Sequence, residues 1–188
     1  MPFAPLVALV LLNGLAHGIS GEYFPVYLSE VVGLSEAALG TVYFVLPLLQ
    51  LAAQPAAGRL ADRRGPLLPL LIGNVAAGAS LLAFCLAPMR PIVISSMLIS
   101  AGLAAFHGVG YQVLVAGLAD RGSRATLYGA LDSLWSLTFI LGPAMGGGLY
   151  SLSPPLPFLV ASALLVSVIA LAAPLSKVGA SKARRDEG

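Results

Sequence analysis

The chain has 188 residues, of which 58% are hydrophobic and only 10% are charged. A soluble domain carries about 25% charged and about 45–50% apolar residues, so this composition excludes a soluble globule and indicates that the lipid bilayer is the solvent. The formal net charge of +2 says little as a total, and the single cysteine excludes both an intramolecular disulfide and a cysteine-based metal site.

Six apolar segments predict six transmembrane helices, because roughly 20 apolar residues are needed to cross about 30 Å of hydrocarbon. In chain order they cover residues 3–28, 38–57, 66–87, 91–118, 125–150 and 157–175. We therefore predict an all-α transmembrane fold, with a six-helix bundle over residues 1–175 and a basic tail over residues 176–188. The first segment is longer than the apolar core of a signal peptide and follows no basic stretch, which favours an uncleaved span.

The basic residues predict the orientation of the bundle. If the chain starts in the cytoplasm, nine of the ten lysine and arginine residues fall on the inner side and only Arg90 falls on the outer side. Such a bias follows the positive-inside rule and requires an even number of spans. We expect a multi-pass protein of the inner (plasma) membrane with both termini in the cytoplasm.

Polar side chains are not spread evenly over the six segments. In the first, second, fourth and fifth they recur at helical spacing and form a stripe, as Gln50 and Gln54 do together with Tyr43. The third and sixth segments carry few polar residues. Because a polar group facing lipid is costly, we expect the striped segments to line an interior and the other two to face lipid. The pattern repeats every three segments in the opposite direction, which predicts two inverted three-helix repeats.

Residues 58–65, between the second and third segments, read GRLADRRG. This stretch resembles the signature loop of the major facilitator superfamily, G-x-L-A-D-R-x-G-R-K, and departs from it where Pro66 and Leu67 replace two basic residues. The matching positions are Gly58, Leu60, Ala61, Asp62, Arg63 and Gly65. We expect the glycines to permit a tight turn outside the membrane, and Arg63 to reach Asp120 across the inner face.

The fifth segment contains a second resemblance. Its GPAMGGG stretch is similar to the G-P-x-x-G-G element of helix 5, or its second-half counterpart, among drug and metabolite antiporters of the same superfamily. The residues concerned are Gly142, Pro143, Gly146 and Gly147. Small residues let helix backbones approach closely and proline bends a helix, so we expect a flexible seam between bundles here.

The resemblance implies a secondary transporter that moves a small molecule by alternating access, with proton-coupled efflux or antiport, rather than an enzyme. It implies no cofactor beyond a proton gradient, and no nucleic-acid partner. Complete members have two six-helix halves, and this chain matches one, most like a C-terminal half. We expect a second half as partner, either another copy or a sister chain. A fragment of a longer transporter and a non-transporting scaffold or assembly subunit are the alternatives.

Four titratable residues within the spans are candidates for proton coupling. An ionised carboxylate at bilayer depth costs on the order of 3 kcal/mol, so Glu22 and Asp132 are expected to be protonated, paired or in a water-filled cavity. His17 and His107 titrate near neutrality when unperturbed, although a structural role is the simpler interpretation of each. Glu22 could instead reach the interface, and Asp132 could pair with a neighbour.

Other polar or aromatic side chains within the predicted spans are candidates for binding substrate. The polar ones could instead bond across helices, and for Trp135, which could stack on a flat substrate, packing in the interior is the simpler interpretation. The set consists of Asn13, Gln50, Gln54, Tyr111, Gln112 and Trp135. Neither a His-x-x-x-His pattern nor clustered acids occur, so the sequence predicts no metal site and no intramembrane enzyme.

Overall fold

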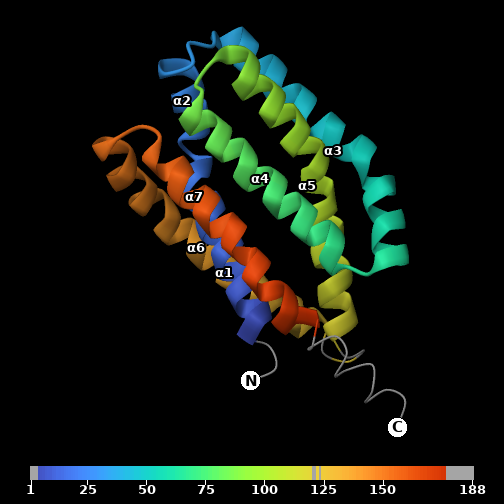
Figure 1. Ribbon diagram of the computed structural model, residues 1–188. Coiled ribbons are helices and arrows are strands. Elements are labelled where there is room, and N and C mark those ends of the chain that lie inside the picture. The colour runs from blue at the N-terminus through green and yellow to red at the C-terminus, as the bar shows by residue number, and fades with distance from the viewer. Residues whose placement is uncertain (1–3, 120–121, 123, 177–188) are drawn as a thin grey trace.

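The computed structural model describes residues 4–119, 122 and 124–176 (Figure 1). Every regular element within these residues is a helix. In chain order they are α1 (Ala4–Gly21), α2 (Phe24–Glu30), α3 (Glu36–Arg64), α4 (Leu67–Leu86), α5 (Arg90–Leu118), α6 (Arg124–Leu152), α7 (Leu156–Ser167) and the 3-10 turn η1 (Val168–Leu171).

Five helical stretches are long and apolar enough to cross a membrane: α1 together with α2, then α3, α4, α5, and α7 continued to Ser176. The predicted all-helical membrane fold is confirmed. The fifth predicted span corresponds to α6, which has 29 residues but is not one of these five. Its glycines, hydroxyl residues and Asp132 lower its hydropathy. The count of six spans therefore stays a prediction.

The connection between α3 and α4 is shorter than the sequence suggested. Residues 58–64 form the last turns of α3, and the helix ends only at Gly65, whose φ is +78°. The expectation of a loop over residues 58–65 was wrong, because Gly58 lies among good helix formers and stays helical. The turn needs a left-handed glycine followed by proline, and Gly65 and Pro66 supply that pair.

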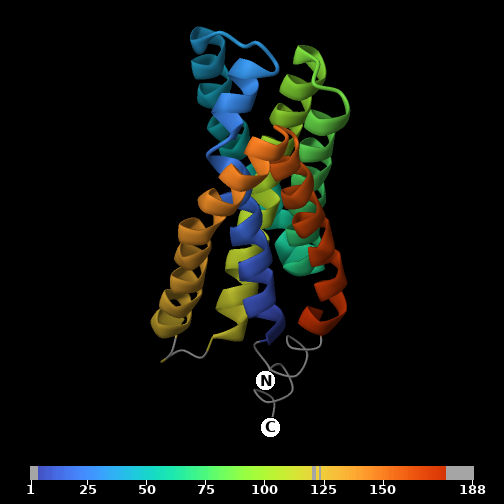
Figure 2. The ribbon, with the colours of Figure 1, turned by 90° about the vertical axis from the view of Figure 1, so that its left-hand side faces the viewer.

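The helices pack in a definite neighbour order. α3 packs on α5, α5 on α4, α4 on α7, α7 on α1, and α1 on α6. Figure 1 shows α3 beside α5 on one side of the molecule, and Figure 2 shows α6, α1 and α7 next to one another on the other side. α3 and α6 therefore lie at the two ends of the order, and α4 and α7 at its centre.

Burial follows this order and differs from the expectation that α4 and α7 mainly face lipid. About 44% of the apolar stretch of α4 is buried, compared with 6% for α3. Asn74 and Ser80 of α4 and Ser162 of α7 are among the buried polar residues, and the Ser162 hydroxyl donates to the Gly78 carbonyl at 2.8 Å. The few polar groups of these helices are used between helices, whereas Gln50 and Gln54 of the α3 stripe are exposed.

Two hydrophobic clusters fill the bundle. One is aromatic and lies where α2, α4 and α7 meet, with Tyr27, Phe84 and Phe158 in mutual contact and the Tyr27 hydroxyl donating to the Phe84 carbonyl at 2.8 Å. The other is built mostly from leucines of α1, α4, α5 and α6, among them Leu9 and Leu70. Together they hold the helices as one packed unit.

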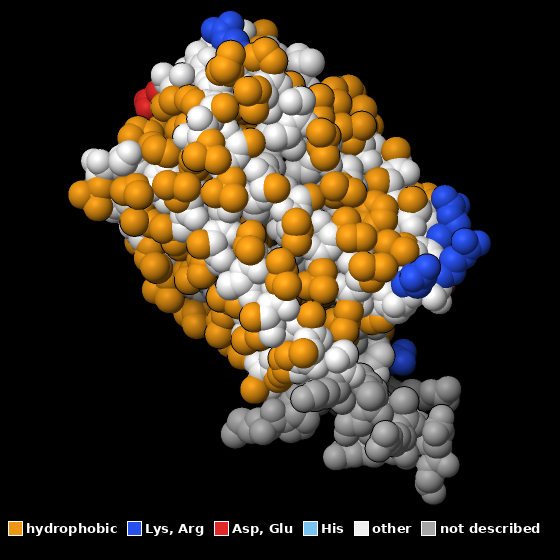
Figure 3. Space-filling view, in the orientation of Figure 1, with side chains coloured by type: hydrophobic (Ala, Val, Ile, Leu, Met, Phe, Trp, Pro, Cys, Tyr) orange, Lys and Arg blue, Asp and Glu red, His pale blue; other side chains and the backbone are white. Residues whose placement is uncertain are grey.

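The surface separates charge from apolar side chains. Hydrophobic side chains cover most of the face in Figure 3, and arginine side chains gather in patches at its edges. Arg59, Arg63 and Arg64 are exposed in the last turns of α3. Arg90 begins α5 at the opposite end from the start of α1, and its guanidinium donates to the carbonyls of Val32, at 3.1 Å, and Gly33. The remaining basic residues of the tail lie outside the described residues.

α1 and α6 are in backbone contact through small residues. A Cβ built on Gly142 would lie 2.5 Å from backbone atoms of Gly18, and one built on Gly18 would lie 2.7 Å from the Thr138 carbonyl oxygen. Only glycine allows this approach. The glycine element was expected to form a seam between bundles, but Gly142 and Gly146 pack within this one, against α1.

We predict that Gly142→Ala destabilises the bundle by about 1–3 kcal/mol, because the added methyl group forces the two backbones apart. Gly148→Ala is the matched control, since a Cβ at Gly148 would meet no described atom within 4 Å. The control should be neutral or more stable by up to about 1 kcal/mol, from helix propensity alone. Unfolding of both variants in lipid nanodiscs measures the difference. Equal effects at the two positions would refute the tight contact.

Candidate cavity between three helices

A cavity of about 250 Å³ lies where α1, α5 and α6 converge. Two of its lining residues are aliphatic and the others are polar or aromatic. The lining consists of Leu9, Val10, Asn13, His107, Tyr111, Asp132 and Trp135. The structure thus brings together five of the candidate residues, which are spread over more than a hundred positions of the sequence.

Close helix crossings place these side chains. The α1–α6 contact at Gly18 brings Asn13 of α1 toward Trp135 and Asp132 of α6, which lie three residues apart on one helical face. On the other side, a Cβ on Gly73 of α4 would lie 2.6 Å from the backbone nitrogen of His107. Because α4 and α5 touch at this level, the His107 ring is held between α4 and the cavity.

Asn13 supplies an acceptor to this cavity. Its side chain is 2% exposed, and its Nδ2 donates to the Leu9 carbonyl at 3.0 Å. Its Oδ1 has no hydrogen-bond partner within the part of the chain that the structure describes. Buried polar atoms are normally paired, so an unpaired oxygen in a cavity lining marks a place for a donor from water or a ligand.

His107 contacts two other candidate or buried polar residues. The Asn74 amide lies 2.9 Å from its Nδ1, and the Tyr111 ring lies parallel to its own, with centroids 6.3 Å apart. Asp132 is exposed at the edge of the cavity. The cavity therefore combines one carboxylate, one amide oxygen and one imidazole with aromatic walls, which suits a flat molecule carrying both polar and apolar parts.

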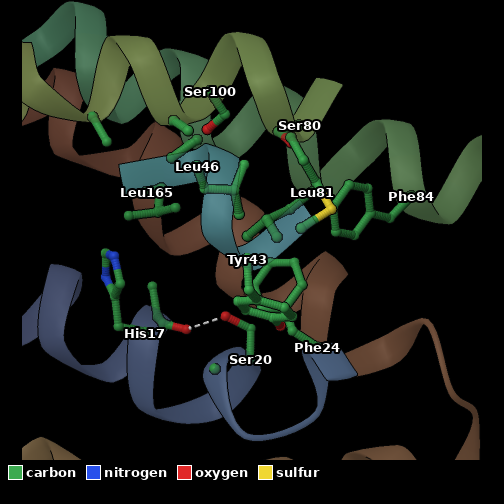
Figure 4. A pocket seen from close by; sticks show the side chains of 16 residues that line it. His17, Ser20, Phe24, Tyr43, Leu46, Ser80, Leu81, Phe84, Ser100 and Leu165 are labelled. Atoms are coloured by element: carbon green, nitrogen blue, oxygen red, sulfur yellow. Dashed lines mark hydrogen bonds between the residues drawn. The ribbon is translucent and has the colours of Figure 1, made fainter. Parts of the chain in front are cut away.

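A second cavity of about 300 Å³ lies between α1, α2, α3, α4, α5 and α7. Figure 4 shows His17 and Phe24 reaching toward it from one side and Ser100 from another. Its lining is largely apolar, with Tyr43 among the few polar side chains. The His17 ring also contacts Trp135, with centroids 5.5 Å apart. His17 thus connects the second cavity with the wall of the first.

Several candidates lie away from these two cavities. Glu22 is exposed in the break between α1 and α2, and Gln50 and Gln54 are exposed on α3. Gln112 is exposed too, and its backbone carbonyl accepts from the Tyr128 hydroxyl at 3.1 Å. None of these four lines either cavity among the residues described.

The signature motif lies apart from the cavities as well. Asp62 and Arg63 are exposed on the last turn of α3. Asp120, the expected partner of Arg63, lies outside the described residues. Within the described ranges no three histidine, cysteine or acidic side chains gather as metal ligands.

Asn74 and Ser80 are site residues that the sequence reasoning did not select. Ser80 lines the second cavity, and Asn74 contacts His107. Both belong to a segment assigned to lipid because its polar residues are few. The sequence did carry a signal for Asn74. An unpaired amide in an apolar span is costly, so an asparagine there is expected to have a hydrogen-bond partner on a neighbouring helix.

The match to known proteins covers nearly the whole chain. The profile of the Major Facilitator Superfamily matches residues 6–188. The chain is 28% identical over 155 residues to the quinolone resistance protein NorA of Staphylococcus aureus, which covers 82% of this chain and 40% of that protein. It is 28% identical over 140 residues to multidrug resistance protein 1 of Bacillus subtilis strain 168, which covers 73% of this chain and 36% of that protein. The chain thus spans 40% or less of these curated relatives.

We predict that water reaches the first cavity but not the outward face of α4. In a Cys85→Ser background, cysteines at Tyr111 and Asp132 should react with a water-soluble methanethiosulfonate at least about tenfold faster than a cysteine at Leu82, since only a hydrated thiol forms the reactive thiolate. Leu82 is the control because it is exposed on a face without a cavity. Equal labelling at Leu82 and Asp132 in nanodiscs would contradict a hydrated cavity.

Proposed function

Because the chain belongs to the major facilitator superfamily, we propose that it forms part of a secondary transporter that exports small organic molecules across the inner membrane by alternating access. Membership places it among membrane transporters rather than enzymes. The observation that carries the proposal is the cavity between α1, α5 and α6, which gathers Asn13, His107, Asp132 and Trp135.

The lining favours an aromatic substrate with a basic group. Trp135 and Tyr111 offer ring faces on which a flat molecule or a cation can stack. Asp132 offers the negative charge that attracts a protonated amine. The printed names of the two relatives, a quinolone resistance protein and a multidrug resistance protein, support export of such molecules.

A second six-helix half completes the proposed transporter. A cavity of about 250 Å³ is below the range of about 300–1,000 Å³ usual for small-molecule sites, so this half supplies one wall of a larger site. α3 and α6 leave large apolar side chains exposed, with Phe44 68% and Ile140 72% accessible. The partner, a copy or a sister chain, covers these two edges.

The neighbour order supports the proposed inverted repeat. Counted as spans, with α1 and α2 as the first, the order α3–α5–α4–α7–α1–α6 reads 2–4–3–6–1–5. Exchanging span 1 with span 4, 2 with 5 and 3 with 6 changes this order to 5–1–6–3–4–2, which is the same order read backwards. Two triplets related by a two-fold axis in the membrane plane produce this property.

Proton coupling is assigned to Asp132. One carboxylate in a water-accessible cavity can hold either a proton or a substrate cation, and competition between them couples proton entry to substrate exit. Glu22, exposed at the break after α1, and His17, beside Trp135, are proposed as further proton-carrying groups. The proton gradient is then the only energy source that the proposed transporter needs. In the proposed orientation both termini lie in the cytoplasm.

The proposal is tested by export of a fluoroquinolone from vesicles with an imposed proton gradient. Asp132→Asn should reduce gradient-driven export at least about tenfold, because a neutral amide neither releases a proton nor attracts a cation. Glu36→Gln is the control, since that carboxylate is exposed at the start of α3 and should not affect export. Normal gradient-driven export by Asp132→Asn would remove Asp132 from the mechanism.

The same vesicles identify the partner. Export by this chain alone shows that copies pair, and export only after a second six-helix half is added shows a split transporter. No export in either arrangement, from protein that is folded and inserted, would contradict the proposal and favour a scaffold or assembly subunit.

A further inference from the structure

The amide of Asn74 holds the imidazole of His107 in a defined way. Asn74 is 1% exposed, and its Nδ2 lies 3.0 Å from the Leu70 carbonyl oxygen and 2.9 Å from His107 Nδ1. An amide nitrogen carries two protons, so each of the two acceptors receives one. Both donors of the Asn74 side chain are then used, while its Oδ1 has no partner among the described residues.

The opposite orientation of the amide is unfavourable. It would place Oδ1 against the Leu70 carbonyl oxygen, where two acceptors would face each other without a proton between them. With Nδ2 facing both acceptors, the arrangement that uses both amide protons has Nδ1 of His107 accepting. The ring proton is then on Nε2, the nitrogen left for the cavity that the His107 ring lines.

The other histidine of the chain is held in the opposite way. Nδ1 of His17 lies 2.8 Å from the backbone carbonyl oxygen of Asn13. A carbonyl oxygen only accepts, so Nδ1 of His17 carries a proton. The two histidines thus differ in which ring nitrogen is protonated, although His107 lines this cavity and His17 contacts Trp135 in its wall.

We propose that Asn74 is a positioning residue, which fixes His107 as the Nε2–H form so that it donates a hydrogen bond to a ligand in the cavity. Asn74 acts only through His107, since it belongs to α4 and the cavity is formed by α1, α5 and α6. The ligand carries a hydrogen-bond acceptor, such as a carbonyl oxygen, toward His107. It carries a donor toward the unpaired Asn13 Oδ1. The identity of this ligand rests on the proposed export function.

Nitrogen NMR of the full chain in nanodiscs tests the protonation of both rings. The sequence has only two histidines, so histidine labelled with ¹⁵N gives two ring patterns, and His17→Gln assigns them. We expect an unprotonated Nδ1 and a protonated Nε2 for His107, and a protonated Nδ1 for His17. A protonated Nδ1 in wild-type His107 would overturn the proposal without the need for any variant.

Two substitutions at Asn74 test whether this residue determines which ring nitrogen of His107 is protonated. In Asn74→Asp the carboxylate accepts where the amide donated, so the Nδ1 signal of His107 should shift to the protonated type while that of His17 stays unchanged. In Asn74→Leu no donor remains, and His107 should show a mixture of the two forms. An unchanged His107 spectrum in both folded variants would overturn the role of Asn74. If Asn74 only packed between helices, its replacement by aspartate would not change the Nδ1 signal of His107.

Binding of a fluoroquinolone tests the consequence. Loss of one hydrogen bond should weaken binding by about tenfold in Asn74→Asp and in His107→Phe. Because Asn74 acts through His107, Asn74→Asp should have no further effect in the His107→Phe background, and additive losses would contradict this. If the spectra are as expected but the quinolone does not bind wild type, the positioning role of Asn74 stands, and the ligand and the proposed function fail.

Discussion

The absence of water in the hydrocarbon core is the constraint on which this structure depends. A polar side chain there has to find its partner within the protein, and its position is set by that partner. Ser162 donates to a carbonyl of the neighbouring helix, Tyr27 donates to the Phe84 carbonyl, and Asn74 spends both protons on Leu70 and His107. These bonds lie between or along helices and leave the outer faces to apolar side chains. The side-chain oxygens of Asn13 and Asn74 are both buried and have no partner among the described residues, and of these two residues only Asn13 lines the cavity.

Close helix contacts at glycines position the side chains that line the cavity. At Gly18 and Gly142 the backbones of α1 and α6 touch, and at Gly73 the backbone of α4 touches that of α5 at His107. The first contact sets the positions of Asn13 and Trp135, and the second sets the position of His107. In lipid no hydrophobic force draws helices together, so close packing of this kind contributes much of the cohesion of the bundle. The cavity is thus a consequence of two backbone contacts rather than of any loop.

The sequence was sufficient for the helical membrane fold and for much of the cavity. Polar faces indicated Asn13, His107, Tyr111 and Asp132, the capacity to stack on a flat substrate indicated Trp135, and the structure places all five in one lining. It was not sufficient for Asn74, since a stripe marks a face turned toward water or ligand, and a lone residue bonded to a neighbouring helix leaves no stripe. Periodicity also could not tell the exposed stripe of α3 from an enclosed one, because Gln50 and Gln54 have the same spacing in either case. The end of α3 was misplaced because Gly58 resembles a turn residue, whereas only Gly65 adopts the left-handed conformation.

The central claim is that ligands bind between α1, α5 and α6, and the fluorescence of Trp135 tests it most directly. Trp135 is the only tryptophan of the chain and lines that cavity. In nanodiscs a fluoroquinolone should quench its emission in a saturable way, because a bound aromatic ligand lies against the indole. In Asn13→Leu, which removes the unpaired oxygen, the half-saturating concentration should rise about tenfold. Quenching that rises without saturation, as for free tryptophan in the same lipid, or saturation unchanged by Asn13→Leu, would contradict the account.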